Sequence, residues 1–220
     1  MHCIVTAGPT YEPLDEVRRL TNFSTGRLGS ELVNYLAARG HEATLLIGQQ
    51  ATYRGERHAR QTEDFTTTAN LRERLQALAS PAVSAVFHAA AVSDFTFGKV
   101  WRRSPQGELM ELKGGKLSTR EGTLLAELLP TPKIIAELRQ WFPTARLVGW
   151  KYEVEGGRAE VIRLGERQLT DCRTDACVAN GPAYGAGFGL VKGGGAVTHL
   201  PDTAALFAAL EEFMRERHEI

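Results

Sequence analysis

The chain has 220 residues, of which 43% are hydrophobic and 24% are charged, so it has enough apolar surface for a core and is not a disordered segment. Lysine plus arginine and aspartate plus glutamate both total 26, which makes the formal net charge zero and excludes an overall attraction to nucleic acid or to an anionic membrane. We expect residues 1–220 to form a single domain, because single α/β domains reach this length without splitting.

The first elements alternate between strand and helix. The apolar run 3–7 predicts a short buried strand, and Gly8-Pro9-Thr10 ends it with a turn. After a long loop, apolar residues recur at helical spacing over 25–39, and Gly40 supplies a stop signal. Residues 41–48 then predict a second strand. Units of this kind are typical of parallel sheets with right-handed crossovers.

The alternation continues along the chain. The run 84–92 is the most continuously apolar, as expected for a central parallel strand that is buried on both faces. Thr131 and Pro132 predict the N-cap and the first position of a helix. The other predicted elements are strands at 59–65, 146–152 and 176–179, helices at 67–79 and 158–169, a hairpin at 187–198 and a final amphipathic helix at 202–216. We therefore expect an α/β fold with a Rossmann-like, open, mostly parallel sheet and helices on both faces.

One stretch interrupts the alternation. Residues 96–124 hold glycines at 98, 107, 114, 115 and 122, together with the cations Lys99, Arg102, Arg103, Lys113, Lys116 and Arg120. We expect this stretch to be a basic flap inserted into the domain.

The cysteines and the start of the chain suggest a compartment. Cys3, Cys172 and Cys177 are odd in number and have no paired metal spacing, and Met1 leads directly into a strand-like run without a signal peptide. No apolar run approaches the roughly 20 residues needed to cross a bilayer. We expect a protein of the reducing cytoplasm with no membrane span.

The loops after the first and fourth strands should face one crevice, because ligands of open α/β sheets bind outside the carboxyl ends of the strands. The first loop contains Gly8 and Thr10, and the second contains Ser93, Asp94 and Phe95. Gly8 and Thr10 are therefore candidate nucleotide-binding residues.

A third candidate segment, Asn22 to Gly29, precedes the first helix. The free N–H groups and positive dipole end of a helix attract phosphate, so Ser24, Thr25 and Gly26 are candidates for binding it. The alternative is that Ser24 or Thr25 only caps the helix and that the glycines only help it to pack.

Two common nucleotide-binding motifs are absent. The glycine spacing is not G-x-G-x-x-G, and Gly115-Lys116-Leu117-Ser118 is not a Walker A loop, because Leu117 separates the lysine from the serine and residue 110 is not glycine. These departures disfavour an ordinary dehydrogenase and a P-loop NTPase.

Each remaining candidate for a binding role also has a simple structural explanation. Asp94 can hold Mg²⁺ or a ribose hydroxyl, or it can simply form a turn. Lys116 can reach a bound anion, or it can be a solvated lysine. Phe95 and Trp150 can stack on a base, or they can pack in the core. The histidines show no shared metal spacing.

Several motifs, taken in order, resemble one family. That family is phosphopantothenoylcysteine synthetase, also called phosphopantothenate-cysteine ligase, and the resemblance covers most of the chain. Because no flavin-binding decarboxylase domain accompanies them, the resemblance is to the bacterial stand-alone form. The motifs are Val5-Thr6-Ala7-Gly8-Pro9-Thr10, Glu12-Pro13-Leu14-Asp15-Glu16-Val17-Arg18, the run from Asn22 to Gly29, Ala89-Ala90-Ala91-Val92-Ser93-Asp94, Gly115-Lys116-Leu117-Ser118 and Thr131-Pro132-Lys133-Ile134-Ile135.

The resemblance implies an activity and a set of roles. The family joins 4'-phosphopantothenate to L-cysteine in coenzyme A synthesis and uses a nucleoside triphosphate, CTP or else ATP, with Mg²⁺. It implies that Asp94 serves the cation or the nucleotide, that Lys116 is the flap lysine on the triphosphate, and that Asn22 positions the reacting carbonyl. It also implies a homodimer in which a flap reaches the neighbouring site.

The chain departs from the family pattern in places. Gly181 stands where the family often has aspartate, and Cys172-Arg173 stands where lysines are common; Lys151, Arg163 or Arg173 can compensate. Two other functions stay open: a nicotinamide-dependent oxidoreductase, which NADPH titration would detect, and a noncatalytic nucleotide-binding module, which would bind nucleotide without turnover.

Overall fold

The computed structural model describes residues 1–112, 117–118 and 122–216. Its main sheet contains β1 (His2–Ala7), β4 (Glu42–Gly48), β5 (Gln61–Phe65), β6 (Val83–His88), β10 (Arg146–Tyr152), β11 (Ala176–Asn180), β12 (Phe188–Lys192) and β13 (Val197–Leu200). The strand order is β13-β12-β11-β10-β6-β1-β4-β5, with every pair from β11 to β5 parallel and the pairs of β12 antiparallel. A 3-10 turn, Gly193–Gly195, links β12 and β13. The predicted open, mostly parallel sheet is confirmed.

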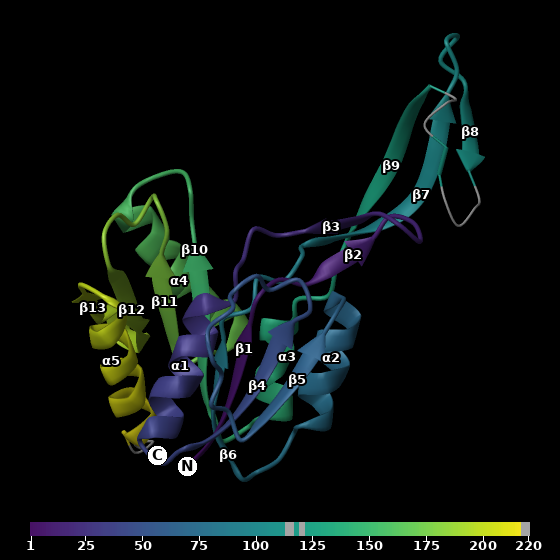
Figure 1. Cartoon of the computed structure of the whole chain (residues 1–220). Helices are drawn as coiled ribbons and strands as arrows, with labels where there is room; N and C mark the ends of the chain where they lie inside the picture. The colour runs from purple at the N-terminus through teal and green to yellow at the C-terminus, as the bar shows by residue number, and fades with distance from the viewer. Residues whose placement is uncertain (113–116, 119–121, 217–220) are drawn as a thin grey trace.

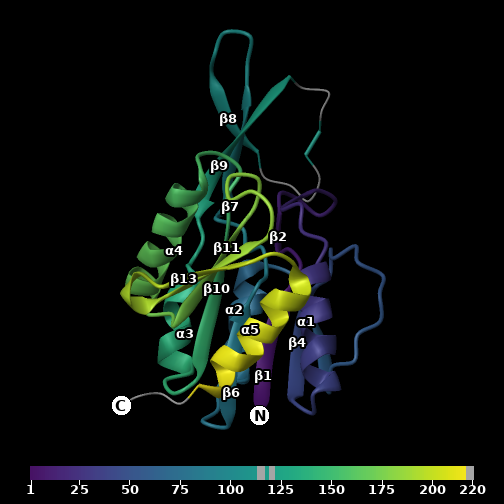
Figure 2. The ribbon, with the colours of Figure 1, turned by 90° about the vertical axis from the view of Figure 1, so that its left-hand side faces the viewer.

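Helices cover both faces of this sheet (Figures 1 and 2). α1 (Arg27–Ala38) and α5 (Thr203–Arg215) pack on one face, and α2 (Thr68–Ala77), α3 (Ile134–Trp141) and α4 (Arg158–Cys172) cover the other. Successive residues of a strand point to opposite faces. Val5 therefore joins the core under α1 and α5, while Ile4 joins the core under α2 and α3. Predicted helices on both faces are thus confirmed.

A second, smaller sheet forms an arm. β7 (Phe95–Arg103), β8 (Leu109–Leu112) and β9 (Thr123–Pro130) pair antiparallel in the order β8-β7-β9 and project away from the main sheet (Figure 1). A hairpin of β2 (Tyr11–Pro13) and β3 (Arg19–Thr21) lies near the base of this arm. The expected basic flap therefore contains regular strands, which the sequence did not predict. Its strands are mostly exposed, so they lack the alternation of buried and polar residues that marks a strand.

Several predicted boundaries are off by a few residues, among them the end of α4, which lies at Cys172 and not at 169, and two of them bear on the site. β6 ends at His88 and not at 92, because the chain turns toward β1: Ala89 N donates to Thr6 O over 3.2 Å, and Ala90 N donates to Thr6 Oγ1 over 3.1 Å. α3 begins at Ile134 and its N-cap is Lys133. Thr131, the predicted cap, instead donates through Oγ1 to Ser93 O over 2.5 Å, so it ties the end of the arm to the loop after β6.

The cysteines are buried and free in the described structure. Burial raises the pKa of the Cys3 and Cys177 thiols to about 12, so neither is a thiolate at neutral pH. Among the described residues, no helix has the length and apolar character that spanning a membrane requires.

His88 predicts a pH dependence of stability. It is 6% exposed, its Nδ1 lies 2.9 Å from Thr6 Oγ1, and burial lowers its pKa to about 4. The unfolded chain takes up this proton near pH 6.5, whereas the folded chain resists it, so stability falls as the pH drops from about 6.5 toward 4. We expect the wild type to lose about 2 kcal/mol of unfolding free energy between pH 8 and pH 5 through this group.

Urea unfolding of the wild type and of His88→Gln at both pH values measures this effect. The carboxylates titrate alike in both proteins, so the difference between the two pH slopes isolates His88. Equal slopes would show that His88 is not a buried neutral histidine.

Candidate active site

The candidate site lies where the loops after β1 and β6 diverge. The chain continues from β1 to β4 on one side of the sheet and from β6 through the arm to β10 on the other. Open α/β sheets bind their ligands at such a topological switch point. The two loops contact each other directly: Thr10 N donates to Ala91 O over 3.1 Å, and Ala91 N donates to Gly8 O over 3.0 Å. The loops therefore meet, as the topology predicts.

The start of α1 lies against the first of these loops. Gly26, the N-cap, has a φ of 76°, and Gly8 has a φ of 77°. A Cβ added to Gly26 would lie 2.9 Å from Ile47 Cδ1 and 3.3 Å from Gly8 Cα, so the backbone conformation and the close approach both require glycine. Gly26 supplies no side-chain hydrogen bond to α1, so the first turn keeps N–H groups that suit an anion.

Ser24 and Thr25 precede this N-cap. Thr25 Oγ1 accepts a hydrogen bond from Arg27 N over 3.2 Å, and Ser24 N donates to Asn22 O over 2.9 Å. Thr25 thus satisfies one N–H of the first turn, as the capping alternative proposed. Gly29 serves packing, because an added Cβ would lie 2.6 Å from Ala7 Cβ. Phosphate binding by Ser24, Thr25 and Gly26 stays a prediction.

Asn22 connects the two sides of the crevice. It is exposed and lies between β3 and α1, and its Nδ2 donates to Ala91 O over 3.1 Å. This bond orients the amide against the loop after β6. A primary amide has a second N–H and an acceptor oxygen, so Asn22 keeps hydrogen-bonding capacity for a ligand.

Asp94 and Phe95 lie where the arm leaves the main sheet. Asp94 O accepts a hydrogen bond from Thr131 N over 3.0 Å, while the residue itself is exposed. Phe95 opens β7 and is 45% exposed. The backbone of this corner is thus fixed, and its carboxylate and ring are accessible. Their roles toward a cation and a base stay predictions.

Thr10 has a different place from the one predicted. Its side chain is completely buried, and its Oγ1 accepts a hydrogen bond from Ser93 N over 2.9 Å. The hydroxyl therefore holds the two loops together and does not face the crevice. The signal that suggested a ligand contact, its position after a strand, did not reveal that Ser93 takes this hydroxyl.

Trp150 is half-buried and packs against the core under α1 and α5, as its alternative predicted. Within the described part of the chain, however, neither its buried Nε1 donor nor the buried acceptor Asn180 Oδ1 has a hydrogen-bond partner. Both residues lie near the carboxyl ends of neighbouring strands, β10 and β11. An unpaired buried polar atom costs about 1–3 kcal/mol, so these two atoms fit a polar ligand, and base stacking by Trp150 stays a prediction.

Sequence reasoning missed an ion pair beside the flap. Asp15 Oδ2 lies 2.5 Å from Arg18 Nη2, and both side chains bind the backbone of Leu117. Lys116, the predicted flap lysine, lies outside the described residues. The i,i+3 spacing of Asp15 and Arg18 was visible in the sequence, but nothing there indicated a partner about 100 residues away.

The described residues contain no group of three or more His, Cys, Asp or Glu side chains that could hold a metal ion by itself. Asp94 offers one exposed carboxylate. Mg²⁺ commonly takes one or two carboxylates together with substrate phosphates and water, so the residues fit a cation that arrives with a nucleotide and not a cage made by protein alone.

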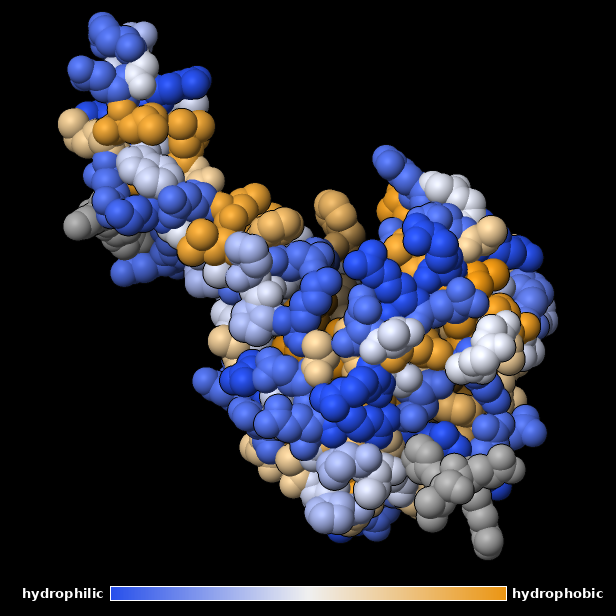
Figure 3. Space-filling model, turned by 180° about the vertical axis from the view of Figure 1, so that it is seen from behind, coloured by the Kyte–Doolittle hydropathy of each residue, from blue (hydrophilic) through white to orange (hydrophobic). Residues whose placement is uncertain are grey.

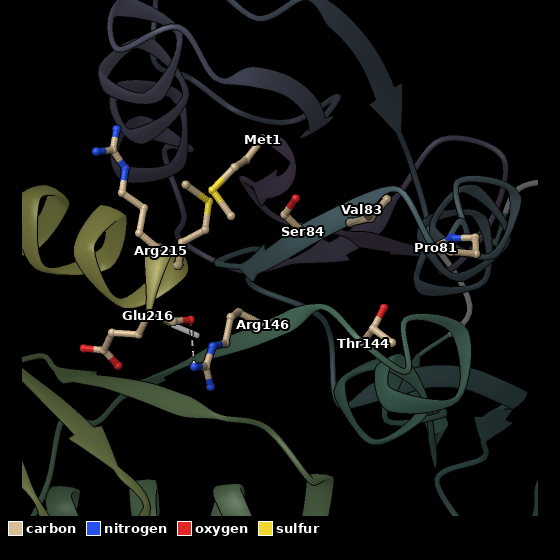
Figure 4. A pocket seen from close by; sticks show the side chains of 9 residues that line it. Met1, Pro81, Val83, Ser84, Thr144, Arg146, Arg215 and Glu216 are labelled. Atoms are coloured by element: carbon tan, nitrogen blue, oxygen red, sulfur yellow. Dashed lines mark hydrogen bonds between the residues drawn. The ribbon is translucent and has the colours of Figure 1, made fainter. Parts of the chain in front are cut away.

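A hollow of about 360 Å³ lies elsewhere (Figure 4). It opens beside the amino ends of β6 and β10, where Val83 and Arg146 begin these strands. The crevice lies at the carboxyl ends, so this hollow is not part of the candidate site. Its lining residues are Met1, Pro81, Val83, Ser84, Thr144, Arg146, Met214, Arg215 and Glu216.

Comparison with known proteins identifies the family. Residues 1–202 match the family described as DNA/pantothenate metabolism flavoprotein C-terminal domain. The chain belongs to this family. A curated relative, the coenzyme A biosynthesis bifunctional protein CoaBC of Thermococcus kodakarensis, is 31% identical over 181 residues, which are 80% of this chain and 40% of the relative. The chain thus spans less than half the length of that relative.

Solved structures show the same fold. A DNA/pantothenate metabolism flavoprotein from Streptococcus pneumoniae superimposes with a TM-score of 0.82 at 24% identity, and 98% of each chain is covered. A Cab2 mutant in complex with phosphopantothenate-cysteine superimposes with a TM-score of 0.66 at 17% identity, over 98% of this chain and 89% of the other. These likenesses confirm the fold expected for this family.

Proposed function

We propose that the chain is a phosphopantothenate-cysteine ligase that works with a nucleoside triphosphate, CTP or else ATP. The observation that carries this proposal is the Asn22 amide, which is held 3.1 Å from Ala91 O across the switch point, next to a helix start suited to phosphate. Support comes from the family, from the naming of its relative in coenzyme A biosynthesis and from the product-like molecule in the Cab2 complex.

The reaction has two steps. A carboxylate acylates poorly, so the carboxylate of 4'-phosphopantothenate attacks the α-phosphate, which releases pyrophosphate and leaves an acyl nucleotide. The amine of cysteine then attacks the acyl carbon, the amide forms, and nucleoside monophosphate leaves. Both reactants of the first step are anions, so the site must offset their repulsion.

This chain offers several groups for that task. The first turn of α1, with Gly8 and Gly26 beside it, would hold phosphate oxygens through N–H groups. Asp94 would hold Mg²⁺ or the ribose, and bound Mg²⁺ would neutralise charge on the triphosphate. Lys116 would add a positive charge. Asn22 would hydrogen-bond the acyl oxygen as cysteine attacks.

A pyrophosphate assay tests this function. We expect pyrophosphate release with phosphopantothenate and one preferred nucleotide among ATP, CTP, GTP and UTP, and amide product only when cysteine is also present. Nucleotide binding without any turnover would favour the noncatalytic module, and turnover that ignores phosphopantothenate would contradict the ligase.

We also propose that two copies of the chain pair through the arm, on which hydrophobic residues are visible in Figure 3. The arm carries exposed apolar side chains on a sheet that no described helix covers: Leu109, Met110, Leu125, Leu128 and Leu129. Successive strand residues point to opposite faces, so both faces of this projecting sheet carry exposed apolar side chains, which favours association. We expect light scattering to give a dimer for the wild type and a monomer for Leu128→Lys; a monomeric wild type would contradict the pairing.

A further inference from the structure

The hydroxyl of Thr6 joins the ends of two central strands. Thr6 in β1 and His88 in β6 are register partners in the parallel sheet. Thr6 is completely buried, and His88 is 6% exposed. Thr6 Oγ1 lies 2.9 Å from His88 Nδ1 and accepts a hydrogen bond from Ala90 N over 3.1 Å. One hydroxyl therefore contacts both the last residue of β6 and the loop that follows it.

The direction of these hydrogen bonds follows from the groups involved. A backbone N–H can only donate, so the Thr6 oxygen accepts from Ala90 N and keeps its own O–H for another acceptor. Within the part of the chain that the structure describes, His88 Nδ1 is the one acceptor that Thr6 Oγ1 meets at hydrogen-bond distance. Burial lowers the pKa of His88 to about 4, so the ring is neutral at neutral pH and Nδ1 can accept. The proton of the ring therefore lies on Nε2.

The loop held in this way carries a carbonyl that two other segments share. Ala91 directly follows Ala90 in the loop after β6. Its oxygen accepts hydrogen bonds from Thr10 N and from Asn22 Nδ2, both over 3.1 Å, and its N–H donates to Gly8 O over 3.0 Å. A carbonyl oxygen has two lone pairs, so these two donors use both of them. The peptide groups of Ala91 therefore set where the loop after β1 and the Asn22 amide lie relative to each other.

We propose that Thr6 and His88 are positioning residues of the candidate site, which act through the loop after β6. By fixing the turn at Ala90, they hold the next carbonyl where it orients the Asn22 amide. This role rests on the proposed function, because it assigns the pair to the step in which the amide would meet the acyl oxygen. Both side chains are buried, so they affect a substrate only through the backbone that they hold.

The same sheet contains a matched control. Thr44 in β4 is also a buried strand threonine, 4% exposed, and its Oγ1 lies 3.2 Å from Nε2 of His2, the first residue of β1. The crevice lies at the carboxyl ends of the strands, so this contact lies toward the opposite end. Thr6→Val and Thr44→Val each remove a buried hydroxyl that contacts a histidine. A general loss of stability would affect both variants, whereas a loss of positioning would affect Thr6→Val alone.

The first measurement is ¹⁵N NMR of the histidine rings in the wild type, which needs neither activity nor a folded variant. We expect His88 at pH 7 to be a neutral ring with its proton on Nε2. The signal is assigned by its loss in His88→Gln. A proton on Nδ1 would overturn the pairing, because the Thr6 oxygen would then accept twice and its own proton would lack the acceptor assigned to it.

The second measurement is hydrogen exchange of the Ala90 amide. We expect this amide to exchange at least about 10-fold faster in Thr6→Val than in the wild type and in Thr44→Val, because its acceptor is gone. Thr6→Ser keeps the hydroxyl and should restore slow exchange. If Thr6→Val does not fold, Thr6→Cys tests the same contact, because a thiol donates and accepts hydrogen bonds only weakly. Unchanged exchange at Ala90 would overturn the role of the hydroxyl.

The third measurement separates the two chemical steps in single turnovers. We expect Thr6→Val to slow amide formation by roughly 10-fold and to change the rate of pyrophosphate release by less than about twofold, because the Asn22 amide acts on the second step. Thr6→Ser and Thr44→Val should behave like the wild type. Single-turnover rate constants do not depend on how much of the enzyme is folded, so a purely structural role would leave both of them unchanged.

Two outcomes of the kinetic experiment have different meanings. Equal rates of amide formation in Thr6→Val and Thr44→Val would overturn the positioning role. An inactive wild type would instead refute the proposed function, while the NMR and exchange measurements would still test the hydrogen bonds of Thr6.

Discussion

Replacing Asn22 with alanine is expected to lower the rate of amide formation by about 10² to 10³-fold, while pyrophosphate release continues. The Nδ2 bond to Ala91 O fixes the amide at the junction of the two loops, where the acyl oxygen would gain charge as cysteine attacks. A donor that is already in place stabilises this charge without reorganising. Its loss therefore affects the second step more than the first.

Rapid-quench measurement of both products tests this expectation. Asn34→Ala is the matched control, because Asn34 also donates its side-chain amide to a backbone carbonyl, Glu56 O at 2.8 Å, but it lies outside the crevice on α1. Asn22→Ala should accumulate acyl nucleotide, and Asn34→Ala should not. Unimpaired amide formation in Asn22→Ala would remove Asn22 from the reacting centre.

Replacing Lys116 with alanine should slow the first step, the release of pyrophosphate, whereas replacing Asn22 should slow the second. A lysine near the triphosphate would offset the repulsion between the attacking carboxylate and the phosphates, so its loss should slow pyrophosphate release by about 100-fold. Amide formation would slow equally, because it depends on the first step. The two variants together would separate activation from amide formation.

Lys99→Ala is the control for Lys116→Ala. Lys99 is another cation of the same insertion, and its Nζ lies 3.5 Å from Glu111 Oε2 within the arm. Removing it lowers the charge of the insertion equally without removing the predicted contact. A similar loss of pyrophosphate release in both variants would point to the overall charge of the arm and not to Lys116.

The sequence predicted the main sheet because its strands and helices follow simple rules. Strands buried on both faces read as continuous apolar runs, and β10 begins and ends at its predicted residues. The end of β6 was missed because Ala89 to Val92 are as apolar as the strand itself. The carbonyl and the hydroxyl of Thr6 accept hydrogen bonds from Ala89 N and Ala90 N, and only these contacts show where the chain turns away from the strand.

The candidate site was predictable only in part. Gly8 and Gly26 were both candidate binding residues on the sequence, and the structure brings them together. Thr10 looked equally suitable, but its hydroxyl is taken by Ser93, which is a long-range contact that no local pattern encodes. The ion-pair contact with Leu117 was missed for the same reason, since it joins segments about 100 residues apart.

The central claim is that the crevice brings a carboxylate onto the α-phosphate of a nucleotide, and oxygen labelling tests it most directly. Phosphopantothenate with both carboxylate oxygens labelled with ¹⁸O is turned over with cysteine and the preferred nucleotide, and the products are examined by mass spectrometry. We predict one label in the nucleoside monophosphate and one in the amide. Label in pyrophosphate or inorganic phosphate, or none in the nucleotide, would contradict the account.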